Sequence, residues 1–338
     1  MNRHVLYLLL ILLLGGLGGF LLMQKDQQVG GLEQGLLLPE LAARAGDLVT
    51  IRVQDGQGQN IEVSLVDGQW RVSSHGQYPA DEEKLSQLLT ELLEAKKLQA
   101  KTGQAEHYHR LGLQDIDAPD SSASLLTIST ATQSWQLLVG NVPASGQGQF
   151  VRMADGGQSW LIDQGLSLPV LARDWMRQPV LDIPEENVAS VSRLDANQRW
   201  QVKRTTMTED FLLASKPDGR MLKYATILNG LVSNLTNINF EDVRPLEDSF
   251  WQSLTPVASL QLSLFDGTEL TLELAVQDGK HFLRVSGTEQ GAYWENWLYQ
   301  VSNFTASQIN KEQEDFLAEP AEPEDKLPVS VEEGDAPR

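Results

Sequence analysis

A stretch of nineteen residues without a charged side chain, residues 5–23, constrains this chain more than any other feature. As a helix that rises about 1.5 Å per residue, it would reach about 28 Å, close to the thickness of the hydrocarbon core of a bilayer. The stretch therefore predicts a transmembrane anchor over residues 1–23. Everything that follows is then a polar ectodomain.

The charges that flank this stretch predict its orientation. Arg3 precedes it, whereas Lys25 and Asp26 cancel each other just after it. Because positive charge is retained on the cytoplasmic side, we expect the N-terminus in the cytoplasm and the ectodomain on the far side. A cleavable signal peptide is the alternative, but residues 22–25 lack an A-x-A-like cleavage site.

Glycines inside the predicted anchor allow a second interpretation of that segment. Gly15 and Gly19 have the G-x-x-x-G spacing that lets two membrane helices approach closely. Glycine is also common in membrane spans in general, and Gly16 and Gly18 blur a single face. Both interpretations stay open from the sequence.

The acidic balance of the chain limits its partners. The formal net charge is −20 and there are no cysteines. Binding to nucleic acid or to anionic lipid depends on lysine and arginine, so these partners are not expected. The absence of thiols excludes disulfides, thiol catalysis and thiolate metal sites, and it also excludes a lipid-modified cysteine.

Strand and helix patterns begin after an expected linker at residues 24–46, which contains a short apolar docking segment at 36–41. Residues 61–66 alternate apolar with polar and lead into Asp67-Gly68, a hairpin signal. Asp81 can cap a helix with leucines at three- and four-residue spacing. Further strands are expected at four places, namely residues 124–129, 135–139, 150–153 and 160–163.

The second half of the ectodomain echoes the first in four short motifs. The four pairs occur in the same order and are residues 69–72 with 199–202, 123–125 with 258–260, 150–152 with 282–284, and 159–161 with 296–298. A candidate helix follows the tryptophan motif in each half, and the one after Trp200 covers residues 224–235. Similar patterning in unrelated antiparallel strands is the alternative to duplication.

These patterns predict an α+β fold of two related antiparallel β-meander-plus-helix units behind the anchor. The expected units are residues 47–182 and 183–310. Residues 311–338 hold ten acidic side chains, three basic side chains and four prolines, which predicts a disordered acidic tail.

Few residues suggest reactive chemistry. His107 and His109 would face one side of an extended chain, but nothing at ligand spacing completes a metal site. Gly140, Gly146 and Gly148 lack the Lys-Ser/Thr and the helix start that phosphate binding needs, and they predict a loop. We therefore expect no catalytic residue, metal or cofactor.

A group of aromatic residues near the end of the ectodomain supports a different class of function. Trp294 and Trp297 lie among Tyr293 and Tyr299. At alternating strand spacing they could form an aromatic surface for carbohydrate or protein, although core packing is the commoner role. An envelope carbohydrate-binding or carbohydrate-acting domain, with Glu241 and Asp242 as its acidic pair, is the alternative function.

Several stretches together resemble domain of unknown function 4340, a family of exported bacterial proteins. They are residues 37–41, Trp70-Arg71-Val72, Tyr78-Pro79-Ala80-Asp81, Leu111-Gly112-Leu113, Gly140 and Phe150-Val151-Arg152. The similarity spans about residues 36–182 and extends more weakly into the second half, which lacks a Tyr-Pro-Ala-Asp and a Leu-Gly-Leu.

The resemblance implies a role and a place. Members of the family resemble accessory proteins that are encoded beside ABC-type exporter permeases and gliding-type auxiliary subunits. It implies a non-enzymatic accessory protein in the bacterial inner membrane with a periplasmic ectodomain, partnered by an ABC-type permease. The motif residues, together with Trp200, would then act through the fold.

Overall fold

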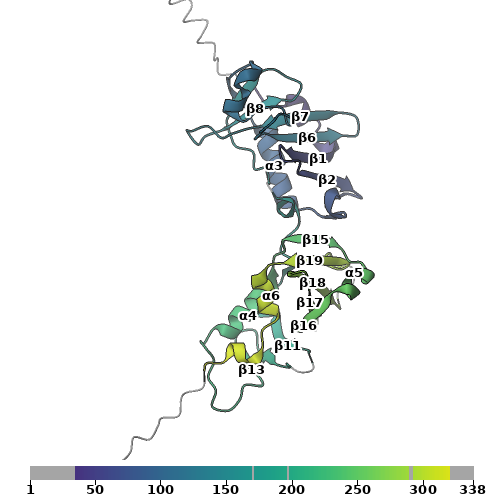
Figure 1. Cartoon of the computed structure of the whole chain (residues 1–338), viewed down its shortest axis with the longest axis vertical. Helices are drawn as coiled ribbons and strands as arrows, with labels where there is room; N and C mark the ends of the chain where they lie inside the picture. The colour runs from purple at the N-terminus through teal and green to yellow at the C-terminus, as the bar shows by residue number, and fades with distance from the viewer. Residues whose placement is uncertain (1–34, 170, 196–197, 289–291, 320–338) are drawn as a thin grey trace, which may run out of the picture. The chain divides into compact units, whose positions relative to one another are not determined.

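The structure is a computed structural model that describes residues 35–169, 171–195, 198–288 and 292–319. The fold is α+β, with antiparallel sheets and a few helices, as the sequence predicts. The chain divides into two compact units between Gln178 and Pro179 (Figure 1). The predicted boundary lay four residues later, but β10 (Leu181–Asp182) pairs with β14 (Asn237–Ile238) and so belongs to unit 2.

Within the described ranges, no helix is both long enough and apolar enough to cross a membrane. The predicted anchor at residues 1–23, including Gly15 and Gly19, lies outside those ranges.

Unit 1 is built on one nine-stranded antiparallel sheet in the order β4-β3-β2-β1-β6-β7-β8-β9-β5. Its strands are β1 (Leu48–Asp55), β2 (Asn60–Val66), β3 (Gln69–Val72), β4 (Tyr78–Pro79), β5 (Lys97–Ala100), β6 (Ser124–Thr130), β7 (Ser134–Val139), β8 (Gln149–Met153) and β9 (Ser159–Ile162). Its helices are α2 (Pro39–Ala42), α3 (Glu82–Glu94) and the 3₁₀ turns η1 (Ala45–Asp47), η2 (Ser73–His75), η3 (Ala105–Leu111) and η4 (Ala172–Trp175).

Helix α3 lies against this sheet because its apolar residues fall on one face (Figure 1). Leu85, Leu88 and Leu92 are buried, and the Asp81 side chain accepts the Lys84 amide at 3.1 Å as the expected N-cap. The helix therefore starts where the sequence predicts and closes one side of the core.

The Glu91 carboxylate anchors a later loop to α3. It accepts hydrogen bonds from the Ser167 amide at 2.6 Å, the Ser167 hydroxyl at 2.8 Å and Gln87 Nε2 at 2.9 Å. Desolvation alone would raise the pKa of Glu91, but these hydrogen bonds favour the charged form and outweigh it. The pKa of Glu91 therefore lies below its ordinary value of 4.5.

We expect Glu91→Gln to lower the free energy of unfolding at neutral pH by about 0.5–1 kcal/mol, discounted for solvent screening. A lowered pKa stabilises the fold above the unfolded value, and this contribution disappears as the pH falls through the folded value. The difference between variant and wild type should therefore shrink below pH 4.5, the ordinary value. Urea unfolding at several pH values measures it. Glu94→Gln, on an exposed position of the same helix, is the control, and an equal loss there would contradict the assignment.

The second part of the predicted linker belongs to unit 1. Leu37, Leu38 and Leu41 are buried, and the Leu37 amide donates to the Ala95 carbonyl at 2.7 Å. The apolar run therefore docks onto the end of α3 because its leucines complete the core, so the expectation of a linker up to residue 46 is wrong for residues 36–46.

Unit 2 is built on one eight-stranded antiparallel sheet in the order β13-β12-β11-β16-β17-β18-β19-β15. Its strands are β11 (Val188–Arg193), β12 (Gln201–Lys203), β13 (Leu212–Leu213), β15 (Asp242–Pro245), β16 (Thr255–Leu264), β17 (Glu269–Gln277), β18 (Lys280–Gly287) and β19 (Trp297–Val301). Its helices are α4 (Ile227–Thr236), α5 (Asp248–Ser253), α6 (Asn303–Ile309) and the turns η5 (Glu185–Asn187) and η6 (Gln313–Phe316). Helices α4 and α6 pack together beside the sheet (Figure 1).

The two sheets share one strand order. When β3 of the first sheet is aligned with β13 of the second, the strands that follow in each order correspond one to one. Strand β1 then matches β11, β6–β9 match β16–β19, and β5 matches β15. Even the irregularity where β1 pairs with β6, between Leu48 and Thr50, recurs between Val188 and Ser190. The halves therefore have the same topology.

Strand register corrects most of the sequence echoes. Phe150 and Phe282 occupy equivalent positions, because their strands pair alike with β7 and β17. Trp70 lies on β3, whereas Trp200 lies just before β12, the counterpart of β2. By the same comparison, the echo of residues 123–125 with 258–260 is shifted by one residue, and that of residues 159–161 with 296–298 is shifted by two. Strands with alternating apolar and aromatic residues resemble one another in several registers, so short motifs can match out of register.

The predicted tail begins too early. Phe316 and Leu317 are fully or almost fully buried, and the Phe316 ring meets Trp200 edge to face at 5.2 Å between centroids. The Lys311 carbonyl accepts hydrogen bonds from Trp200 Nε1 and from Arg193. Residues 311–317 are therefore packed on unit 2, with Phe316 and Leu317 in its core and the acidic side chains exposed, since burial of the two apolar side chains is favourable.

Candidate functional site

The motif residues Leu111-Gly112-Leu113 and Gly140 meet at one point of unit 1. Gly112 ends η3 in the left-handed conformation, with φ of 66°, which suits glycine. The Asn141 amide donates to the Leu111 carbonyl at 2.8 Å. A Cβ on Gly140 would lie only 2.3 Å from that same carbonyl oxygen, so the two segments can approach this closely only because residue 140 lacks a side chain.

Arg152 ties the same region together from within. Its side chain is 4% exposed and stacks over the Tyr108 ring at 4.3 Å. Its guanidinium donates to the carbonyls of Leu113 at 3.2 Å and Gly156 at 3.0 Å, and it pairs with Asp115. Leu113, Asp115 and Gly156 lie in loops and Tyr108 lies on η3, so Arg152 holds these segments together.

The Tyr78-Pro79-Ala80-Asp81 motif fastens the end of unit 1. Tyr78 is completely buried, and its hydroxyl donates to the Arg177 carbonyl at 3.2 Å. The Arg177 amide donates to the Pro79 carbonyl at 2.9 Å, and the Asp81 amide donates to the Trp175 carbonyl at 2.9 Å. The motif therefore links β4 and the start of α3 to residues 175–177 by hydrogen bonds. The Trp70 carbonyl also accepts a hydrogen bond from the Ala80 amide.

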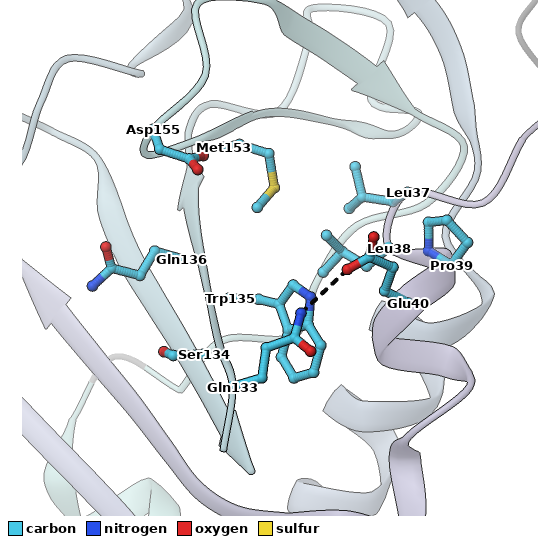
Figure 2. Close-up of a pocket in the computed structure, with 10 residues that line it drawn as sticks. All are labelled: Leu37, Leu38, Pro39, Glu40, Gln133, Ser134, Trp135, Gln136, Met153 and Asp155. Carbon is cyan, nitrogen blue, oxygen red and sulfur yellow. Dashed lines mark hydrogen bonds between the residues drawn. The ribbon is translucent and has the colours of Figure 1, made fainter. Parts of the chain in front are cut away.

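An open pocket of about 670 Å³ lies on unit 1 between the segment at residues 37–40 and the ends of β7 and β8. Figure 2 shows Leu37 and Leu38 on one side of it, Met153 from β8 across from them, and Trp135 from β7 below both in this view. Its other lining residues are polar or lie at the rim, namely Pro39, Glu40, Gln133, Ser134, Gln136 and Asp155.

The pocket combines an apolar floor with an acidic rim. Leu37, Leu38 and Trp135 are buried, whereas Glu40 and Asp155 are exposed. Gln133 Nε2 donates to Glu40 Oε2 at 3.2 Å and joins the two walls (Figure 2). Both charged lining residues are carboxylates, so the pocket suits an apolar group that carries positive charge.

The comparison with known families agrees with the motifs. The profile of the family described as Domain of unknown function (DUF4340) matches residues 70–256. This chain belongs to the DUF4340 family. Comparisons with curated proteins and with solved structures gave no match.

The DUF4340 match confirms the resemblance and moves its limits. It begins at Trp70 and ends at Pro256, near the start of β16, so it covers parts of both units. The motifs in the sequence placed the similarity at residues 36–182, with a weaker extension into the second half. The segment at residues 37–41 therefore lies outside the match, although its residues 37–40 line the pocket.

The histidine pair is placed differently from the expectation. His107 and His109 lie on the 3₁₀ turn η3, so they are not on an extended chain. In the part of the chain that the structure describes, no group of three or more metal-ligating side chains comes together. Trp200 is buried in unit 2, the unit in which the sequence analysis places it.

The aromatic surface of the alternative function is wrong. Trp294 and Tyr299 are buried, and the Tyr293 hydroxyl donates to the carbonyls of Pro179 at 2.7 Å and Val180 at 2.6 Å. Strand β19 carries Tyr299 into the core of unit 2, and the connection that precedes this strand carries Trp294. Glu241 and Asp242, the proposed acidic pair, are exposed at the edge strand β15 and the residue before it.

The pocket itself was missed by sequence reasoning. The available signal was the apolar run at residues 36–41, which predicted docking but not what it would dock beside. Trp135 sits far from that run in sequence, and only the pairing of β7 with β8 brings Met153 and Asp155 next to it.

Proposed function

We propose that this DUF4340 protein is a non-enzymatic accessory protein of an ABC-type transport complex in the cell envelope. Residues 5–23 span the inner membrane, the N-terminus is cytoplasmic, and both units are periplasmic. The observation that carries the proposal is the open pocket on the unit that directly follows the apolar stretch. It offers a binding surface built on a rigid sheet.

The pocket is within reach of a membrane partner. Residues 24–36 separate the predicted anchor from the pocket-lining segment, and thirteen residues extend to at most about 45 Å.

Co-purification tests this proposal directly. The full-length protein is isolated from membranes solubilised in a mild detergent, and its companions are identified by mass spectrometry. We expect an ABC-type permease to be enriched relative to a control in which an unrelated transmembrane segment, fused to an unrelated periplasmic domain, is isolated in parallel. A membrane fraction that yields the protein without any permease would refute the transport role.

We also infer that the two units are copies of one ancestral unit. The shared strand order and the recurrent irregularity on β1 and β11 support this. In other family members, sequence similarity between halves should be highest when Phe150 is aligned with Phe282 and Leu48 with Val188. Equal similarity in shifted alignments would count against duplication.

A further inference from the structure

The start of each unit is built in the same way. Leu36 pairs with Lys96 immediately after α3, and Leu181 pairs with Ile238 immediately after α4. A proline and a glutamate follow in both, at Pro39-Glu40 and at Pro184-Glu185. The segment that forms one wall of the unit 1 pocket therefore has a direct counterpart in unit 2.

The opposite wall also has a counterpart, which strand register identifies. Leu137 pairs with Met153 in unit 1 as Leu272 pairs with Val285 in unit 2. Strand β8 ends at Met153, whereas β18 continues two residues beyond Val285 to Gly287, which pairs with Leu270. Trp135 is the counterpart of Leu270, because Trp135 pairs with Ile128 on β6 as Leu270 pairs with Leu262 on β16.

In unit 2 an indole fills this place. A Cβ added to Gly287 would lie 2.6 Å from Leu270 Cδ2 and 3.1 Å from Trp294 Cη2, so the Trp294 ring and the Leu270 side chain occupy the space above Gly287. Trp294 is only 5% exposed. It comes from the connection between β18 and β19, and its neighbour Tyr293 bonds to the carbonyls of Pro179 and Val180.

In unit 1 the corresponding connection is too short to supply such a side chain. It comprises residues 154–158 between β8 and β9, against residues 288–296 in unit 2. Trp135, larger than Leu270, provides an aromatic floor, and the space above it is the open pocket of about 670 Å³.

We propose that the unit 1 pocket binds an aromatic side chain flanked by basic residues, presented by a partner protein, as unit 2 binds its own Trp294. The apolar floor of Leu37, Leu38 and Trp135 receives the ring, and the carboxylates of Glu40 and Asp155 attract the flanking charge. This inference rests on the proposed function in one respect, which is that the partner protein belongs to a complex in the cell envelope.

Methionine labelling makes the test specific, because the chain has six methionines and Met153 lines the pocket. Full-length protein with ¹³C-methyl methionine, reconstituted in lipid nanodiscs, is titrated with the capped tripeptide Lys-Trp-Lys. We expect the Met153 methyl resonance to shift with saturation. Those of Met207 and Met221, which are exposed on unit 2, and of buried Met176 should stay in place.

Matched peptides and variants separate the two parts of the proposal. Lys-Ala-Lys should produce no saturable shift, and Glu-Trp-Glu should bind more weakly than Lys-Trp-Lys. Asp155→Lys should weaken Lys-Trp-Lys binding about two- to fivefold, as expected for an exposed charge pair. Asp117→Lys, the same charge change at an exposed turn outside the pocket, should leave the affinity unchanged.

Three results would overturn the proposal. They are a Met153 resonance that does not respond, equal shifts at the exposed methionines, and a Met153 shift that follows protein concentration without peptide, which would assign the pocket to a second copy. Peptide binding without permease co-purification would leave this site standing and remove the transport role.

Discussion

Gly140→Ala is expected to destabilise unit 1 by about 3 kcal/mol, the upper part of the range for inserting an atom into a packed region. The new Cβ would lie 2.3 Å from the Leu111 carbonyl oxygen and 2.8 Å from that of Gly112. Both obstacles are backbone atoms, so a rotamer change cannot relieve them. The Leu-Gly-Leu turn would have to move away from β7 and take the Arg152 contacts with it.

Hydrogen exchange measured by mass spectrometry, under mild urea, can localise this effect to one unit. Peptides from unit 1 should lose protection in Gly140→Ala while those of unit 2 keep it. Gly165→Ala is the matched control, because a Cβ there meets nothing within 4 Å. Wild-type protection in Gly140→Ala would show that the close approach of these segments is not required.

Phe316→Ala is expected to destabilise unit 2 by about 3–5 kcal/mol, the usual cost of removing a fully buried aromatic ring. The side chain has no exposed area and contacts Trp200 edge to face. Its loss would also loosen residues 310 and 311, whose carbonyls accept Arg193 Nη1 at 2.9 Å and 2.8 Å.

The same exchange experiment measures this second effect, now in peptides of β11, β12 and η6. Phe304→Ala removes the same group from α6, where the ring is 61% exposed, and should have little effect. If both variants behave alike, then residues 311–317 do not belong to the core, and the acidic tail starts where the sequence suggested.

Local patterns predicted the strands and α3 well because their signals are local. Alternation placed β6 to β9 within one residue of their observed limits, and Asp81 marked the start of α3. The end of unit 2 was predicted poorly, because ten acidic residues dominate the composition of residues 311–338. Whether Phe316 is buried depends on Trp200, more than a hundred residues away, which no local window contains.

The candidate site shows the same limit. The family motifs were visible in the sequence, but that Leu113 and Arg152 touch is a property of the folded sheet. The pocket depends on the different lengths of two connections, residues 154–158 and 288–296. These connections can be compared only after the strand register has shown which strands are equivalent. The sequence echo aligned Trp70 with Trp200, which are not equivalent in the sheets, so the sequence did not show which connections correspond.

Each sheet draws all of its strands from one continuous half of the chain, and this sets an order of events during synthesis. Elongation proceeds at about 5–20 residues per second, so Pro179–Arg338 takes on the order of ten to thirty seconds to appear. Unit 1 can close its sheet in that interval, since β5 and β9 are both already present. The nascent chain therefore never needs to hold an unpaired strand of one unit while it waits for the other, which limits pairing between the wrong strands of two sheets with the same topology.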